Sequence, residues 1–570
     1  MKKLLAVLLA GAMVLSMAAC SGSTTPASQG GSSQAQTQAP TQAPTQAPTQ
    51  APSKSDTPET AAPTAAPTEA PAPSGNVSAR DTLRVEIASD PADFSAYGLW
   101  QTEANRVKYQ VYQTLFRADG KGNVDYSDTI KEYKWATNTQ VDITLYDGIK
   151  FANGDPLTTA DVMWSMDQCA GNATYALLVS TVDLEATRAT IKDDTHMSIV
   201  LKAPTAFFFT NTGAVPITEH DVYDHDKEAT QPNGSGPYVI AEYVPGDHLL
   251  LKRNENYWKL AEQPVPIENV YLQVIAEAQQ RTINLETGAV DLLWDVPTTD
   301  LDSLAADDRY TVATKTSAST LALMVNTTEA SIFHDVKIRE AIHLAIDAAA
   351  VSQVAYGSLG KPCTTICTET FTGVTGGVGR YGTEVYCNGD SAAAKAIVDE
   401  WKAANPDKSL DITIVNNGDK TRGSALEIVK SMLDKVGFNV SIADYEKASY
   451  NDVINRAEEG SWDMYISTNG CPSGLFCDYL NSQWGKDGVN RSRLSNEKLW
   501  ANIAEAITIT DDQARMDELV DESIDILLHQ EFSYVPLVQT ISAWAMDKNL
   551  EGFEVQGVSN LFYPNFYFTK

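Results

Sequence analysis

Residues 410–442 read LDITIVNNGDKTRGSALEIVKSMLDKVGFNVSI, and the fold class follows from this stretch. Leu410 to Val415 alternate between apolar and polar side chains, as a β-strand does. Apolar residues at helical spacing follow from Ala425 to Val436, and Asn439 to Ile442 alternate again. A strand, a helix and a second strand in this order usually form two parallel strands joined by a right-handed crossover. The sequence therefore predicts a mixed α/β fold.

The same two periodicities recur on both sides of this unit. Thr158 is the expected N-cap of one helix, with Asp161 three residues on. Strands are expected at 82–88, 142–147, 196–201, 270–275 and 320–325, and helices at 107–116, 158–166, 338–346 and 393–401. Because the last 490 residues can bury two or three ordinary cores, more than one lobe is expected.

Composition separates the first eighty residues from the rest. They contain none of the Trp, Tyr and Phe residues, and only four basic and three acidic side chains. Residues 81–570 consequently carry 38 basic and 71 acidic side chains, a charge of −33. Binding to phosphate backbones needs clustered Lys and Arg, so this charge argues against a nucleic-acid-binding protein.

The first twenty residues have the form of an export signal. Lys2 and Lys3 precede an apolar stretch that runs to Met17, and Ala18 and Ala19 stand before Cys20. The apolar stretch is too short for a confident spanning helix. Small residues before a cysteine resemble a bacterial lipobox, which implies that Cys20 is lipidated and becomes the mature N-terminus. The alternatives are an ordinary secretory signal with a coincidental cysteine and an uncleaved anchor.

Residues 21–80 consist largely of Ser, Thr, Ala, Gln, Gly and Pro, with Thr-Gln-Ala-Pro repeated in tandem from Thr37 to Pro52. Such a composition cannot form a core, so it predicts a disordered tether between the membrane and the folded body.

Four motifs in the body resemble, in the same order, those of the large solute-binding proteins of ABC importers, the oligopeptide- and dipeptide-binding family 5. They are LYDGIKFANGDPLTTADV at 145–162, GSGPY at 234–238 with NENYW at 254–258, LETGAVD at 285–291, and FHDVKIREAIHLAID at 333–347. Their residues suit architecture better than ligand contact: Gly234, Gly236 and Pro237 suit a tight turn, and Arg339 and Asp347 suit the positioning of a helix.

The resemblance implies a two-lobed, periplasmic-binding-protein-like α/β fold of type II, in the large cluster with an extra subdomain. Two strand-like hinge crossings are expected near 316–326 and 532–540. The expected parts are a signal at 1–20, a tether at 21–80, a first lobe from 81–123, 233–316 and 538–570, an inserted subdomain at 124–232 and a second lobe at 317–537. Ligand would be enclosed by hinge closure of the lobes.

No catalytic or metal-binding motif accompanies this pattern. The sequence lacks a His-Glu-x-x-His zincin motif, a Gly-x-Ser-x-Gly elbow and a phosphate loop. No cofactor is expected. The stretch from Glu219 to Asp226 is the most metal-like cluster, although a solvated loop explains it better than a Zn or Ni site.

Six cysteines follow Cys20, namely Cys169, Cys363, Cys367, Cys387, Cys471 and Cys477. An even number in an exported protein suggests disulfides, with fifteen possible connectivities. Pairs within a cluster, such as Cys363–Cys367 or Cys471–Cys477, are favoured, and free thiols are the alternative.

The resemblance also locates candidate ligand contacts by position. Peptide binders of the family hold the ligand amine with an Asp that falls here on Pro472 or Ser473, and some hold the carboxylate with a strand Arg that falls on Ile466. Neither anchor is matched, and Asp478 is a possible displaced amine partner. The full set of candidate ligand contacts is Trp100, Asn416, Lys447, Asn469, Asp478, Tyr479 and Trp484. Core packing or solvated surface is the alternative for each.

These observations predict a monomeric extracytoplasmic receptor, lipid-anchored through Cys20, that captures a peptide or peptide-like solute and delivers it to an ABC permease. A sugar, an opine or a metal chelate is the alternative ligand within the same class. A secreted surface hydrolase or adhesin on a stalk fits the signal and tether equally well, but not the four motifs.

Overall fold

The computed structural model describes residues 80–98, 101–117, 126–261, 266–363, 365–366, 371, 387–470, 475–486, 488–556 and 560–570. Residues Pro71–Lys570 form one compact unit, whereas Met1–Ala70 belong to a second unit that lies outside these ranges. The expected export signal and nearly all of the expected tether therefore remain predictions. The body can be described by itself.

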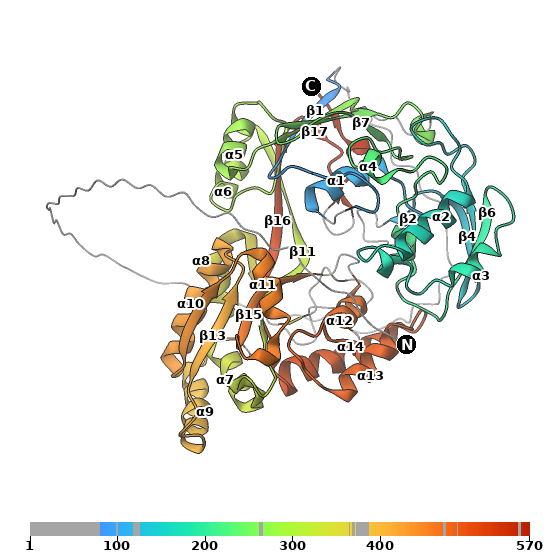
Figure 1. Cartoon of the computed structure of the whole chain (residues 1–570). Helices are drawn as coiled ribbons and strands as arrows, with labels where there is room; N and C mark the ends of the chain where they lie inside the picture. Colours follow the sequence, from blue (N-terminus) through green and yellow to red (C-terminus); the bar gives the residue numbers. More distant parts are fainter. Residues whose placement is uncertain are drawn as a thin grey trace, which may run out of the picture. The chain divides into compact units, whose positions relative to one another are not determined.

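An eleven-stranded mixed sheet runs through the body, and two long strands lie at its middle (Figure 1). In spatial order the sheet contains β14 (Asn439–Asp444), β13 (Asp411–Asn416), β15 (Met464–Gly470), β11 (Tyr310–Val325), β16 (Tyr534–Asp547), β10 (Leu292–Trp294), β1 (Thr82–Ile87), β9 (Asn269–Val274), β8 (His248–Arg253) and β7 (Tyr238–Val244), with β12 (Gly360–Pro362) paired to β16.

Strands β11 and β16 link the two halves of this sheet. They pair antiparallel over most of their length, while β15 pairs with one end of β11 and β10 with the other end of β16. Their register shifts between Thr316 and Thr320, where the side chains of Ser317 and Thr540 hydrogen-bond at 2.6 Å. The two crossings expected from the sequence overlap these strands. The lobe boundaries themselves stay a prediction.

The strand–helix–strand unit forms as expected, because β13 pairs parallel with both β14 and β15. Helix α10 (Lys420–Val436) begins earlier than predicted, since the carboxylate of Asp419 accepts the backbone N–H of Arg422 and caps the helix. It ends at Gly437, whose φ of 115° is a left-handed conformation that favours glycine. The core on one face of this unit joins Ile414, Leu433 and their neighbours.

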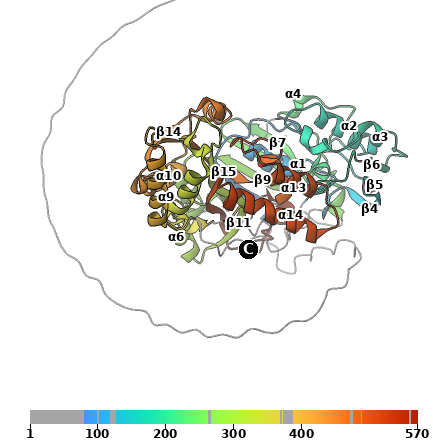
Figure 2. The ribbon, with the colours of Figure 1, turned by 90° about the horizontal axis from the view of Figure 1, so that it is seen from below.

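Helices cover both faces of the sheet around β13 and β15. One core lies under α7 (Val336–Ala345), α8 (Ala348–Ala355), α9 (Ser391–Ala404) and α10. The other lies under α11 (Lys447–Ile454), α12 (Phe476–Trp484), α13 (Glu497–Ala506), α14 (Gln513–Asp525) and the π-helix Ile526–Gln530. Figure 2 shows α13 and α14 side by side. Asp347 caps α8, and Arg339 donates to the carbonyl of Phe333, so both residues position helices as expected.

The other half of the sheet shares one core with a smaller sheet, β4 (Ile130–Thr137), β5 (Gln140–Leu145) and β6 (His196–Val200). Helix α2 (Thr159–Ala170) starts at the predicted N-cap, where Thr158 and Asp161 form a capping box. The remaining helices of this half are α1 (Thr102–Val111), α3 (Leu184–Arg188), α4 (His225–Glu228), α5 (Ala278–Glu286) and α6 (Leu301–Ala306). The two-residue strands are β2 (Phe116–Arg117), β3 (Tyr126–Ser127), β17 (Leu550–Glu551), β18 (Val555–Gln556), β19 (Asn560–Leu561) and β20 (Tyr567–Phe568). The 3₁₀ helices are Ala176–Val179, Thr212–Ala214, Trp258–Ala261, Ile332–His334, Gly357–Leu359, Ala457–Glu459 and Tyr563–Asn565.

The predicted C-terminal end of one helix was wrong. Helix α1 stops at Val111 instead of reaching Phe116. The carboxylate of Asp128 accepts the backbone N–H of Thr114 at 2.9 Å and pairs with the guanidinium of Arg117. These contacts hold the segment extended, and Phe116 enters the short strand β2.

Candidate ligand-binding site

The carboxyl ends of three parallel strands meet at one edge of the sheet. Strands β13, β14 and β15 end there at Asn416, Asp444 and Gly470. In α/β sheets, ligands bind in the crevice outside the carboxyl ends of the strands. Helices α10 and α11 begin directly beyond the first two of these ends. We call the surface between the strand ends and helices α10, α11 and α12 the carboxyl edge. Four candidate ligand contacts lie at this edge or just past it in the chain, namely Asn416, Lys447, Asn469 and Asp478.

Asn416 ties two loops of the carboxyl edge together. Its side chain is 1% exposed, and its amide N–H groups donate to the carboxylate of Asp444 at 2.8 Å and to the carbonyl of Asp419 at 3.2 Å. The Oδ1 atom is buried and accepts no hydrogen bond from the described residues. A buried acceptor of this kind is expensive unless a donor reaches it.

Three predicted side chains gather around Tyr534, which the sequence did not single out. Asn469 lies opposite Thr320 in the β11–β15 register, and the Thr320 and Tyr534 hydroxyls hydrogen-bond. The ring centroids of Tyr479 and Tyr534 lie 5.7 Å and 5.5 Å from that of Trp484. Burial raises the pKa of Tyr534, so its phenol stays neutral. Its place at the start of a predicted crossing was the one available signal.

Burial divides these candidates into two groups. Tyr479 is 0% exposed and Trp484 1%, so both pack beneath the carboxyl edge and support it. Asn469 and Asp478 are each 8% exposed and lie closer to solvent. Helix α11 begins at Lys447, but the side chain of Lys447 lies outside the described part, as do Trp100 and Cys20.

The structure explains why position 466 of β15 cannot supply a peptide anchor. Ile466 is 0% exposed and packs in the core under α7 and α10, so this position does not face solvent. The positions of the amine anchor, Pro472 and Ser473, lie outside the described residues. A carboxylate partner at position 466 would therefore need a different packing of this core.

Sequence reasoning also missed a buried lysine beside the loop after β1. Lys108 on α1 is 8% exposed, and burial lowers its pKa to about 8, while the charge of Asp93 opposes this shift. The helical spacing of Val107 and Val111 marks the inner face of α1, but no sequence pattern marks the neighbouring Lys108 as buried.

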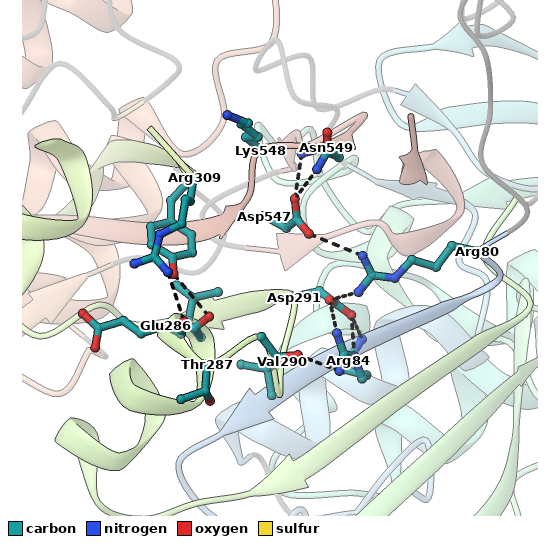
Figure 3. A pocket seen from close by; sticks show the side chains of 13 residues that line it. Arg80, Arg84, Glu286, Thr287, Val290, Asp291, Arg309, Asp547, Lys548 and Asn549 are labelled. Atoms are coloured by element: carbon teal, nitrogen blue, oxygen red, sulfur yellow. Dashed lines mark hydrogen bonds and ion pairs between the residues drawn. The ribbon is translucent and has the colours of Figure 1, made fainter. Parts of the chain in front are cut away.

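A cavity of about 460 Å³ lies elsewhere, beside the LETGAVD turn (Figure 3). Arg80 and Arg84 both pair with Asp291, and Arg80 also reaches Asp547 at 3.4 Å. Asp291 is 1% exposed and additionally accepts the backbone N–H of Arg84 at 2.9 Å. Both arginines are already paired with carboxylates of the protein, and these ion pairs hold segments of the fold together. The cavity is therefore a poor binding site for an anion.

Two residues of the metal-like cluster between Glu219 and Asp226 form hydrogen bonds within the protein. Glu219 accepts from Asn153 and Asn233 at 2.8 and 2.6 Å, and burial raises the pKa of its carboxyl. His220 hydrogen-bonds Asp161 at 2.8 Å, which raises the pKa of the imidazole. Over the described ranges, no group of three or more His, Cys, Asp or Glu side chains is arranged to hold a metal ion.

The disulfide predictions stay open because Cys367 and Cys471 lie outside the described residues. Cys169 and Cys387 are buried thiols, and burial raises the pKa of each, to about 12 for Cys169. No helix of the described ranges is long and apolar enough to cross a membrane.

One curated protein and two solved structures match this chain over most of their length. The chain is 25% identical over 496 residues to the probable D,D-dipeptide-binding periplasmic protein DdpA of Escherichia coli K12, covering 83% of this chain and 91% of that protein. The ABC transporter substrate-binding protein CtaP of Listeria monocytogenes matches with a TM-score of 0.73 at 18% identity, over 86% of this chain and all of that one. NikA of Brucella suis, solved with Fe(III)-EDTA, matches with a TM-score of 0.72 at 18% identity, over 85% and 99%.

These likenesses establish the fold as that of two-lobed periplasmic binding proteins. Residues 127–491 match the family described as bacterial extracellular solute-binding proteins, family 5 middle. The match spans most of the chain and includes β13, β14 and β15. The chain therefore belongs to the bacterial extracellular solute-binding proteins of family 5.

Proposed function

We propose that this protein is a membrane-tethered extracytoplasmic receptor that captures a peptide or peptide-like solute and passes it to an ABC permease without chemical change. Capture takes place as the two lobes close around the solute, with β11 and β16 as the hinge. Closure requires a solute that binds the closed state better than the open one. Cys20 carries the lipid anchor, residues 21–80 form the tether, and the receptor acts as a monomer.

The carboxyl edge is the observation that carries this proposal. Asn416 and Asn469 lie at or next to the carboxyl ends of parallel strands, where ligands bind in sheets of this kind, and Asp478 follows in the first turn of α12. Buried aromatic side chains lie directly beneath these polar groups, a usual composition of small-molecule sites. The D,D-dipeptide-binding relative supports a peptide-like ligand.

A metal chelate is the second candidate, favoured by the NikA structure with Fe(III)-EDTA. The buried Ile466 at the position of the strand arginine supports a ligand without the usual charge-paired ends. Sugars and opines remain within the same class of receptor.

A thermal-shift screen of peptides, sugars, opines and metal chelates on the soluble body tests the proposal. A ligand at a hundred times its dissociation constant stabilises the folded state by about 2.7 kcal/mol. One compound that raises the melting temperature and is recovered intact supports a receptor. Turnover of that compound would indicate an enzyme, and no shift with any class of compound would contradict the proposal.

A further inference from the structure

One phenylalanine of the expected inserted subdomain packs away from the core of its neighbours. All buried apolar side chains at described positions of 126–261, except Phe207, lie in the core that the smaller sheet shares with the first half of the large sheet. Phe207 is 6% exposed and belongs instead to the core under α13 and α14. These helices lie within 317–537, the expected second lobe. Phe207 therefore inserts from one expected lobe into the core of the other.

The next residue packs in the opposite direction. Phe208 is 1% exposed and lies in the core of the first half, where its ring centroid is 5.1 Å from that of Trp135. The carbonyl of Phe207 accepts the backbone N–H of Asn211 at 2.8 Å. The backbone of this segment is thus held in the subdomain, and the Phe207 side chain projects from it into the neighbouring core.

A backbone hydrogen bond joins the same segment to the C-terminal end of α13. The N–H of Ala206 donates to the carbonyl of Ile507 at 3.0 Å, and Ile507 directly follows the last residue of the helix. The last carbonyls of a helix have no partner within it, so they are available to such a donor. Ala206 and Ile507 both pack against the core that holds Phe207. The two expected lobes therefore meet here through residues that belong to neither β11 nor β16.

The energy of one buried ring is enough to bias an equilibrium between open and closed lobes. Burying a phenylalanine side chain favours the buried state by about tenfold to a hundredfold. If the ring is buried only when the lobes are closed, the closed state gains by this factor. Parts of a chain that meet through a small interface usually move relative to each other, so such a contact can break and form again.

We propose that Phe207 is a latch between the lobes: its side chain lies in the core of the second lobe when the lobes are closed and leaves this core when they open. The inference rests on the proposed receptor function and deepens it. A latch strengthens the binding of every solute that the cleft accepts, because it stabilises the closed state without touching the solute. Phe207 is thus a positioning residue, and it holds part of the population closed before any solute binds.

Small-angle X-ray scattering of the soluble body without solute tests this inference. Residues Pro71–Lys570, which form one compact unit, are used for it. Phe207→Ala should have a larger radius of gyration than the wild type, because the ratio of open to closed molecules rises about tenfold or more. Phe207→Leu keeps much of the apolar volume and should have an intermediate radius. Exchange of the Ala206 amide hydrogen should be about tenfold or more faster in Phe207→Ala.

Phe208→Leu is the matched control. It makes the same change in the next residue, but in the core of the first half. It should lower the melting temperature and leave the radius of gyration and the exchange of the Ala206 amide as in the wild type. Melting temperatures of all variants, and slow exchange of the Asn211 amide, show that each protein is folded and that the segment keeps its place in the subdomain.

The outcomes separate this inference from the receptor function. An unchanged radius in both Phe207 variants would overturn the latch, whatever their melting temperatures, because a fixed core contact affects stability without moving the lobes. A radius that grows as much in Phe208→Leu as in Phe207→Leu would also overturn it, since this result indicates general loosening. The receptor function would stand in both cases, because the solute screen tests it separately. A larger radius in the Phe207 variants alone supports the latch, even if the screen yields no solute and the receptor function fails.

Discussion

Protonation of the buried His343 should destabilise this protein as the pH falls. The imidazole on α7 is 1% exposed, and its ring centroid lies 5.2 Å from that of Phe532. Burial lowers its pKa from 6.5 to about 3, and the positive charges of His529 and Arg339 contribute in the same direction. A hydrogen bond to the backbone of Tyr534 opposes the shift. The folded state therefore holds this histidine neutral.

The sign and size of the effect follow from this shift. The unfolded chain binds a proton at His343 below about pH 6.5, whereas the folded protein does not until about pH 3. The stability contributed by the neutral histidine is complete above pH 6.5 and is lost as the pH falls toward 3. The whole effect is about 5 kcal/mol, and about 2 kcal/mol of it is lost between pH 8 and pH 5.

Thermal unfolding at pH 8 and pH 5 measures this loss. For a compact unit of the size of Pro71–Lys570, 2 kcal/mol corresponds to about 2 °C. His343→Gln removes the titrating ring, so we expect its melting temperature to fall by about 2 °C less than that of the wild type between the two pH values, whatever its melting temperature at pH 8. His196→Gln is the control. Because His196 is exposed on β6, the melting temperature of this variant should fall between pH 8 and pH 5 by as much as that of the wild type.

Comparing the pH dependence of stability between the wild type and the two variants removes the contribution of groups that titrate elsewhere. Burial raises the pKa of the carboxyls of Glu86 and Glu228, which opposes the histidine effect by the same amount in all three proteins. If His343→Gln loses as many degrees as the wild type between pH 8 and pH 5, the burial argument is refuted.

Three further predictions concern the architecture and the anchor. Asp291→Ala should cost about 1–3 kcal/mol, because it removes the buried carboxylate that pairs with the partly exposed Arg80 and Arg84 and accepts the backbone N–H of Arg84, and a fall in melting temperature matching less than about 0.5 kcal/mol would contradict this. Gly234→Ala should cost about 1–3 kcal/mol or more, because its Cβ would lie 2.0 Å from the Val111 carbonyl oxygen, and Gly171→Ala should be nearly neutral in the same thermal assay. Cys20→Ser should abolish incorporation of labelled palmitate in cells and release the protein from the membrane fraction; label retained on the variant would exclude this anchor.

Local patterns predicted the elements of the fold that depend on local contacts. The alternation of 410–415 and the helical spacing of 425–436 identified β13 and most of α10, and the capping box at Thr158 fixed the start of α2. The end of α1 could not be predicted in this way. It depends on the carboxylate of Asp128, which reaches back to Thr114 from beyond the helix.

Sequence reasoning located residues of the candidate site only where their position in the chain indicates their place in the fold. Asn416 and Asn469 lie at strand ends, so their place at the carboxyl edge follows from the strands themselves. Tyr534 was missed because its importance comes from side-chain packing against α12 and a hydroxyl contact with β11, both distant in the sequence. Tyr479 and Trp484 were predicted as cleft-edge residues, yet they are buried, since no sequence pattern separates an aromatic under a site from one on its surface.

Charge pairing, and not hollow volume, distinguishes architecture from ligand contact in this chain. The cavity beside the LETGAVD turn contains Arg80 and Arg84, but the carboxylate of Asp291 already satisfies both. A protein with so many carboxylates can pair most of its arginines internally, so a hollow lined by paired arginines is a poor guide to where a solute binds.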